Sequence, residues 1–191
     1  MPQEKHHYII FSAPSGSGKT TLVHQMMKKG LPLAFSISAT SRAPRKNEVQ
    51  GKDYHFIEKE EFEKKMERDE FVEWEEVYQG VHYGTLKSEL NRIFDLGKIP
   101  VFDVDVVGGV QLKKILGDEA LSIFIQVSSI EELAKRLKSR GTDSQESIKK
   151  RLDKAAYEMT FAPNFDQVII NDDLDKAVEE TYQTILNFIN D

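Results

Sequence analysis

The sequence predicts an α/β protein in which a parallel sheet is covered by helices on both faces, with a small mixed α+β insertion and a helical lid. Short apolar segments alternate along the chain with segments whose apolar residues recur at helical spacing. A loop rich in small residues joins the first apolar segment to the first helical one, at residues 13–20. Such strand–helix alternation is typical of a parallel sheet with helices on both faces.

The strands and helices of the main sheet follow from these patterns. Apolar runs predict buried strands at residues 8–11, 33–37, 99–107, 121–127 and 168–170. Apolar residues three and four positions apart predict helices at residues 22–27, 86–97, 130–137, 148–159 and 174–189. Two capping boxes, Ser129 with Glu132 and Asp143 with Glu146, predict where the third and fourth of these helices begin.

A different pattern occupies residues 34–86, which we expect to form the insertion. Residues 38–45 are polar and contain Pro44, so they predict a loop. An acidic helix at residues 59–68 is expected between strands at residues 54–57 and 71–78. Residues 1–33 and 87–191 would then form the core. A lid at residues 137–150 is expected within that core, where a polar segment joins two helices.

Composition excludes several classes of protein. The 191 residues are 39% hydrophobic and 30% charged, as in ordinary globular proteins. There is no cysteine, so disulfides and thiolate metal sites are excluded, which fits a cytoplasmic location. No apolar run is long enough to span a membrane, and the N-terminus does not resemble a signal peptide. A net charge of −6 argues against broad nucleic-acid binding.

The loop after the first strand matches a phosphate-binding P-loop. Its residues are Ala13, Pro14, Ser15, Gly16, Ser17, Gly18, Lys19 and Thr20. Backbone N–H groups of such a loop, with the helix N-terminus behind it, surround a phosphate chain. Lys19 is expected to reach the β- and γ-phosphates, and the Thr20 hydroxyl to hold Mg²⁺. Ala13 departs from the usual first glycine. The alternative is a chance turn, but a strand before and a helix after the loop favour phosphate binding.

Acidic residues and arginines supply further candidates. Asp103 follows an apolar strand and is expected to hold Mg²⁺ together with Thr20. If the strand continues, Asp105 projects from the same face as Asp103, toward the same cleft. Only seven of the 26 basic residues are arginines, and five of these fall in two groups. Arg42 and Arg45 form one group, and Arg136, Arg140 and Arg151 form the other. Such grouping suggests a small anionic ligand, although ion pairing at the surface is the alternative.

The insertion contains groups suited to a second nucleotide. Arg42, Arg45, Tyr54 and Tyr83 offer guanidinium and phenolic donors for a phosphate. Glu73 lies in a largely apolar strand, and its carboxylate can accept from the N1–H and N2–H₂ edge of guanine, which adenine lacks. Ser38 and Thr85 are candidates for O6 or the remaining ring positions. Taken singly, Glu73 could instead be a solvated strand residue and Tyr83 a packing aromatic.

These motifs together resemble those of the guanylate kinases over nearly the whole chain. The resemblance is carried by residues 15–20, 41–45, 48–54, 83–85, 103–105, 136–141 and 168–173. It implies that the chain is an enzyme that transfers the γ-phosphoryl group of ATP to GMP, with Mg²⁺. Besides Ala13, the chain departs from the family pattern at Asn47, where Gly is common, and at Val107, where Gln is common.

The resemblance also implies roles for individual residues. GMP would be bound by Ser38, Arg42, Arg45, Tyr54, Glu73, Tyr83, Thr85 and Asp105. ATP would be bound by residues 13–20 with Thr21, Arg136, Arg140 and Asn171, the last bordering the adenine. Lys19, Arg42, Arg136, Arg140 and Arg151 would be catalytic, with the last three closing over the ATP phosphates from the lid.

The expected mechanism needs no general base. The second pKa of a phosphate monoester is about 6, so the acceptor is already mostly dianionic at neutral pH. Catalysis would then consist of positioning and charge neutralisation, with the insertion and the lid moving inward when both nucleotides bind. Two alternatives stay open: a peptide-binding module with the same fold, and a kinase for another small phosphate. The sequence does not decide between a monomer and a homo-oligomer.

Overall fold

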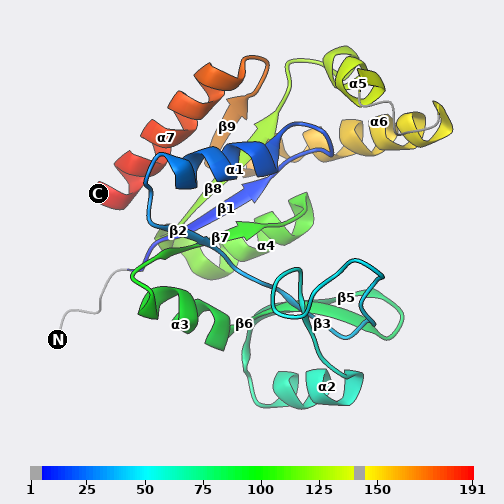
Figure 1. Cartoon of the computed structure of the whole chain (residues 1–191), viewed down its shortest axis with the longest axis vertical. Helices are drawn as coiled ribbons and strands as arrows, with labels where there is room; N and C mark the ends of the chain where they lie inside the picture. Colours follow the sequence, from blue (N-terminus) through cyan, green and yellow to red (C-terminus); the bar gives the residue numbers. More distant parts are fainter. Residues whose placement is uncertain (1–5, 140–144) are drawn as a thin grey trace. The chain divides into compact units, whose positions relative to one another are not determined.

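The computed structural model describes residues 6–139 and 145–191. The described residues fall into two compact units, which are drawn in Figure 1. One unit contains residues 6–33, 101–139 and 145–191, and the other contains residues 34–100. The second unit therefore includes α3 (Lys87–Asp95), which the expected insertion of residues 34–86 leaves out.

The larger sheet has five strands in the order β2-β7-β1-β8-β9, of which β1, β8 and β9 lie wholly in the first unit. The strands are β1 (Tyr8–Ser12), β2 (Leu33–Phe35), β7 (Ile99–Asp103), β8 (Ala120–Gln126) and β9 (Gln167–Ile170). The β1–β7, β1–β8 and β8–β9 pairs are parallel, with Ile10 opposite Phe102 on one side and Ser122 on the other. All five residues of β1 are buried, as the apolar run predicts for a central parallel strand.

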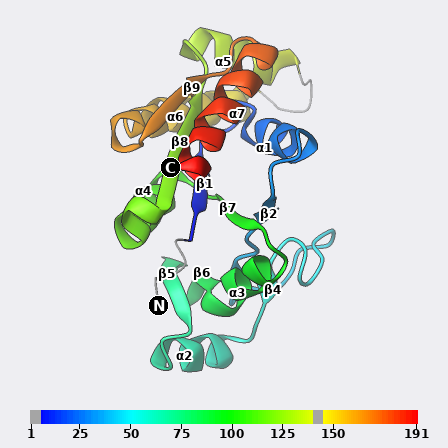
Figure 2. The same cartoon turned by 90° about the vertical axis from the view of Figure 1, so that its left-hand side faces the viewer.

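Helices cover both faces of this sheet (Figure 1, Figure 2). Helix α4 (Val106–Leu116) packs on β1 and β8, while α1 (Lys19–Lys28) and α7 (Leu174–Asn190) pack together on the opposite face. Helices α5 (Ile130–Ser139) and α6 (Gln145–Met159) contact each other through a cluster that includes Leu133, Leu137 and Ile148. Two short 3₁₀ helices, η1 (Gly117–Glu119) and η2 (Ala162–Asn164), precede β8 and β9.

The second unit contains a mixed four-stranded sheet with the order β4-β3-β6-β5. Its strands are β3 (Ala39–Thr40), β4 (His55–Phe56), β5 (Phe71–Tyr78) and β6 (Val81–Leu86). The β3–β4 pair is parallel, and β6 is antiparallel to both β3 and β5. Phe62 of α2 (Lys59–Glu67) is fully buried in a small core with Phe71 and Leu86. This unit therefore has an apolar core of its own.

The parallel sheet, its helices and the small mixed sheet confirm the expected fold class, but one strand was predicted too long and three elements were not predicted. The strand expected to continue to residue 107 ends at Asp103, because Asp105 caps a helix that begins at Val106. Its carboxylate accepts a hydrogen bond from the Gly108 N–H at 2.8 Å, and such capping starts a helix. Helix α4 itself was not predicted. Strands β3 and β6 were also missed, since β3 has two residues and β6 lacks an apolar run.

Candidate nucleotide-binding site

The P-loop joins β1 to α1, as the sequence predicts, and both of its glycines have left-handed backbone conformations. Gly16 has φ of 97° and Gly18 has φ of 91°, a region that favours glycine. The Ser17 N–H donates to the Pro14 carbonyl at 3.1 Å, which closes the turn. A side chain at Gly18 would also collide with the Asn171 side-chain amide. Glycine is therefore required at Gly18 by both its conformation and its neighbour.

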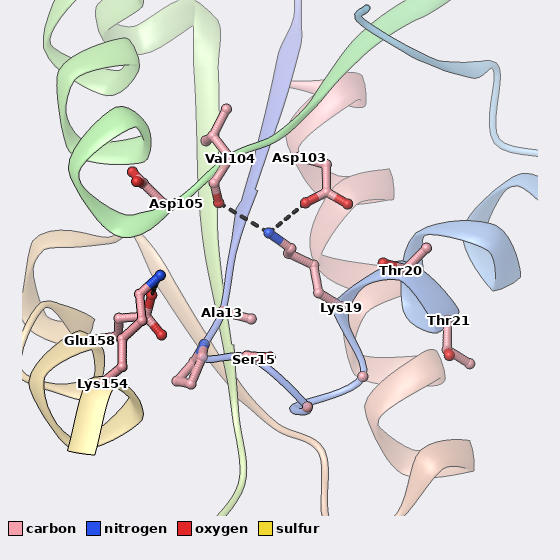
Figure 3. A pocket seen from close by; sticks show the side chains of 13 residues that line it. Ala13, Ser15, Lys19, Thr20, Thr21, Asp103, Val104, Asp105, Lys154 and Glu158 are labelled. Carbon is pink, nitrogen blue, oxygen red and sulfur yellow. Dashed lines mark hydrogen bonds and ion pairs between the residues drawn. The ribbon is translucent and has the colours of Figure 1, made fainter. Parts of the chain in front are cut away.

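A pocket of about 410 Å³ lies over this loop, within the first unit (Figure 3). The loop forms one wall, and Asp103, Val104 and Asp105 line the pocket where β7 ends. The Lys19 ammonium forms an ion pair with the Asp103 carboxylate and donates to the Val104 carbonyl at 3.0 Å. Ligands of open α/β sheets bind at this carboxyl end of the strands. The pocket therefore combines a phosphate-binding loop, a lysine and carboxylates at the expected edge of the sheet.

Thr20 and Asp103 line this pocket together, so the two expected Mg²⁺ ligands are on its wall. In residues 6–139 and 145–191, no three His, Cys, Asp or Glu side chains are grouped so that they could hold a metal. Mg²⁺ commonly takes one or two protein oxygens and completes its shell with water and substrate phosphates. A hydroxyl and a carboxylate beside a phosphate-binding loop fit that requirement.

Asp105 lines the same pocket but does not share a strand face with Asp103. It is the N-cap residue of α4, where its carboxylate is held by the Gly108 N–H. The two carboxylates reach the pocket because one ends the strand and the other begins the helix. The expected shared cleft is thus found, with a different local structure.

A second pocket, of about 350 Å³, lies beside the P-loop and is lined by Arg136 and Asn171, with Gly16, Gly18 and Thr21. Asn171 is buried, and its side-chain amide donates to the Ser17 carbonyl at 2.7 Å. This hydrogen bond therefore stabilises the backbone of the P-loop. Arg136 donates to the Asp172 carbonyl at 3.1 Å and to the Glu132 carboxylate at 3.2 Å.

Of the three expected lid arginines, the two in the described part of the chain line different pockets. Arg136 lines the Asn171 pocket, whereas Arg151 lines a surface groove along α6 with Glu146, Ser147, Lys150 and Lys154. Arg140 lies outside the described residues, as does Asp143 of the second expected capping box. The first capping box is present in part, because the Glu132 N–H donates to the Ser129 hydroxyl at 3.1 Å.

In the second unit, Arg42 is the centre of a polar and aromatic cluster. Its guanidinium group makes two parallel hydrogen bonds to the Glu48 carboxylate, at 2.6 and 2.7 Å. It also donates to the Tyr83 hydroxyl at 2.9 Å, and lies 5.1 Å from the centre of the Tyr54 ring. Three residues expected to bind one phosphate, Arg42, Tyr54 and Tyr83, are therefore together.

Glu48 belongs to this cluster, although sequence reasoning did not select it. The hydrogen bonds from Arg42, with another from the Arg45 backbone N–H, lower the pKa of Glu48 to about 2. The same pair raises the pKa of Arg42, and burial raises that of the Tyr54 hydroxyl. The signal that could have identified Glu48 was an acidic residue three positions after Arg45 in a loop rich in basic residues. The Arg45 side chain itself is exposed.

The residues expected to read the base lie on neighbouring strands of the small sheet. Glu73 on β5 is directly opposite Thr85 on β6, and Glu75 is opposite Tyr83. Because side chains alternate along a strand, Glu73, Thr85 and Tyr83 share one face. Ser38 immediately precedes β3, and its carbonyl accepts from the His55 N–H at 2.9 Å. Glu73 and the cluster around Arg42 therefore lie in the same unit.

Comparison with known proteins agrees with these features. The family model described as guanylate kinase matches residues 5–187. A guanylate kinase of Bacteroides thetaiotaomicron is 55% identical over 182 residues, covering 95% of this chain and 89% of that protein. One from Porphyromonas gingivalis is 53% identical over 182 residues, covering 95% and 97%.

A solved structure extends the likeness to the fold. The crystal structure of guanylate kinase from Anaplasma phagocytophilum superposes with a TM-score of 0.70 at 28% identity, covering 98% of this chain and 88% of that one. Among the described residues, no helix is both long and apolar enough to cross a membrane. The sequence match, the fold and the P-loop pocket agree, and the chain belongs to the guanylate kinase family.

Proposed function

We propose that this chain transfers the γ-phosphoryl group of ATP to GMP, giving ADP and GDP. The observation that carries this proposal is the P-loop pocket, in which Lys19, Thr20 and Asp103 are all in place. A module that only bound peptides would have no use for this lysine and its carboxylate partner. The intact pocket therefore favours a kinase over the binding-module alternative.

On the donor side, the P-loop backbone binds the ATP phosphates, and Lys19 bonds to the β- and γ-phosphates. Its ammonium group is held by the Asp103 carboxylate and the Val104 carbonyl, so it is already oriented in the pocket. Thr20 and Asp103 would hold Mg²⁺, which when bound neutralises negative charge on the phosphates. Arg136, Arg140 and Arg151, which lie in or next to the expected lid at residues 137–150, would add positive charge.

On the acceptor side, the insertion of residues 34–86 binds GMP. Arg42 presents to Glu48 the same two-pronged geometry that it would present to a phosphate. The GMP phosphate therefore binds an Arg42 guanidinium group that Glu48 already holds in place. Arg45, Tyr54 and Tyr83 are further donors to this phosphate. Glu73 accepts from the guanine edge beside Ser38 and Thr85.

No residue is needed to remove a proton from the acceptor, because the GMP phosphate is mostly dianionic at neutral pH. Two histidines of the second unit are occupied by structural contacts. His55 lies 3.4 Å from the Glu89 carboxylate, and His82 is buried against the Phe62 ring. The chain's contribution is to align two polyanions and to neutralise their mutual repulsion.

The experiment compares three acceptors in one assay. ADP release from ATP is measured with GMP, AMP and a phosphosugar in parallel, in Mg²⁺ and at neutral pH. We expect rapid ADP release only when GMP is the acceptor, and the amount of GDP formed should equal the amount of ADP released. Equal rates with all three acceptors, or preference for the phosphosugar, would overturn the proposed substrate, and no release with any acceptor would favour the binding module.

A control separates catalysis by this chain from a contaminating kinase. Lys19→Ala, prepared in the same way, should release ADP roughly 10²–10³-fold more slowly than the unchanged chain. Location in the cytoplasm is part of the same proposal, since both nucleotides are available there. Fractionation of cells that make the chain tests it, and recovery with the membrane fraction would contradict it.

A further inference from the structure

The P-loop pocket contains two charged residues that neither the sequence patterns nor the proposed mechanism uses. Lys154 and Glu158 lie one turn apart on α6, and both line this pocket with Ala13, Pro14 and Ser15. Figure 3 shows the two side chains extending from α6 toward the loop. They belong to the same unit as the loop.

Glu158 is placed where an apolar residue would be expected. Ile148, Leu152 and Ala155 of the same helix pack into the α5–α6 core, and Glu158 continues that stripe about one turn after Ala155. Its side chain is only 7% exposed. One carboxylate oxygen is buried without a hydrogen-bond partner among the described residues. Burying a carboxylate is unfavourable unless it is paired, so this position is not explained by packing.

The partner of Glu158 is Lys154. The Lys154 ammonium lies 3.4 Å from the other carboxylate oxygen of Glu158, and its side chain is 67% exposed. A lysine ammonium has three N–H donors and can hold a carboxylate with one while it faces a ligand with the others. Lys154 also lines the α6 groove that contains Arg151. It therefore lies between the P-loop and an arginine expected to act on ATP.

We propose that Lys154 is an additional cation for the phosphates of ATP, and that Glu158 is the residue that positions it at the P-loop pocket. This inference rests on the proposed function, since it assigns one more contact to the ATP side of the same reaction. The Lys19 ammonium already bonds to the Asp103 carboxylate and the Val104 carbonyl. Lys154 has N–H donors that Glu158 does not use, so it adds positive charge where the ATP phosphates enter the pocket. The proposed contact between Lys154 and the ATP phosphates involves only α6 and the P-loop, which belong to the same unit.

The test begins with Lys154→Met, which removes the charge and keeps most of the side-chain length. We expect KM for ATP to rise about three- to tenfold, the modest effect of a largely exposed cation, while KM for GMP stays within about twofold. Lys154→Arg should restore KM for ATP. Lys135→Met is the matched control, because Lys135 forms an exposed ion pair with Glu132 and does not line this pocket.

Glu158 is tested by a double-mutant cycle, because a purely structural role would not depend on Lys154. Glu158→Gln keeps the shape of the side chain and removes its charge. It should raise KM for ATP in the chain that keeps Lys154 and cause no further increase in the Lys154→Met background. Equal increases in both backgrounds would refute the positioning role. A KM for ATP in Lys154→Met equal to that of Lys135→Met would refute the phosphate contact.

Calorimetric titration with ADP separates this inference from the proposed function. If the wild-type chain binds ADP but does not phosphorylate GMP, the proposed function fails, and Lys154→Met still has to weaken ADP binding about three- to tenfold. If phosphoryl transfer occurs and neither ADP binding nor KM for ATP changes in Lys154→Met, the inference fails alone. Melting temperatures of all variants, expected within about 2 °C of one another, exclude unfolding as the cause.

Discussion

The side chain of Asn171 should stabilise the P-loop by a single buried hydrogen bond. Its amide donates to the Ser17 carbonyl at 2.7 Å, and both residues are buried. Asn171→Ala removes the donor and leaves that carbonyl unpaired away from water. An unsatisfied buried group costs about 1–3 kcal/mol. For a chain of this size, about 2 kcal/mol corresponds to a fall in melting temperature of roughly 4–8 °C.

Asn171→Asp distinguishes this hydrogen bond from simple packing. Aspartate has nearly the same volume but an ionised carboxylate only accepts, so it would face the Ser17 carbonyl without a proton to donate. We expect Asn171→Asp to lower the melting temperature at neutral pH at least as much as Asn171→Ala. Both variants should also bind ADP more weakly, since the loop that surrounds the phosphates loses its support.

The assay is thermal unfolding followed by far-ultraviolet circular dichroism, with calorimetric titration of ADP. Asn187→Ala is the matched control, because Asn187 is exposed on α7 and the same substitution there should leave stability nearly unchanged. If Asn171→Asp unfolds at the wild-type temperature, or if ADP affinity is unchanged in both Asn171 variants, the side chain does not support the loop in the way described.

Four further predictions follow from the two units. Lys19→Ala should lower kcat by roughly 10²–10³-fold, the loss expected for one electrostatic group in an active site, without lowering the melting temperature; near-normal turnover would remove Lys19 from the mechanism. Glu73→Gln should lower the GMP-to-AMP ratio of kcat/KM about tenfold by weakening the contact with guanine, and an unchanged ratio would refute its role. In Gly84→Ala the new Cβ would lie 2.7 Å from the Glu73 carbonyl and 2.8 Å from the Trp74 Cβ, so urea unfolding followed by Trp74 fluorescence should shift to lower urea; an unshifted midpoint would show that the strand yields. The pKa of Glu48 is lowered to about 2, so its contribution to stability is present above pH 4.5 and is lost as pH falls toward 2; Glu48→Gln should flatten this acid dependence of unfolding, and an identical pH profile would contradict it.

The sequence was sufficient where local chemistry determines structure. The P-loop was predicted because glycines, a lysine and a threonine occur between an apolar strand and an amphipathic helix. Its position relative to Asp103 followed from the rule that parallel strands end at one edge of the sheet. The strand over Phe71–Tyr78 was predicted with the bounds that the structure has, since β-branched and aromatic residues dominate it.

Other features depend on contacts that no local pattern reveals. The apolar run around Val106 suits a strand or a helix equally, and the capping hydrogen bond from Gly108 to Asp105 decides for a helix. Strand β3 exists because the backbone of Ala39 and Thr40 pairs with β4 and β6, which are distant in the sequence. Strand pairings of this kind can be identified only from the three-dimensional structure.

The same limit applied to the candidate site residues. Arg42 was selected from its type, but the carboxylate that binds it was not, because six residues separate them along an irregular loop. Asn171 was expected beside the adenine, and its hydrogen bond to the Ser17 carbonyl spans 154 positions of sequence. The pair on α6 was missed for another reason: lysine and glutamate four residues apart usually form an exposed surface pair.

The structure of the chain crystallised with GMP and ADP is the most direct test of how the cationic groups are used. We expect Arg42 and Arg45 to bond to the GMP phosphate, Glu73 to accept from the guanine edge, and Lys19 to lie at the β-phosphate of ADP. Density showing Arg42 still bound to Glu48, with the GMP phosphate elsewhere, would contradict the account of the acceptor site. So would both arginines pointing into solvent.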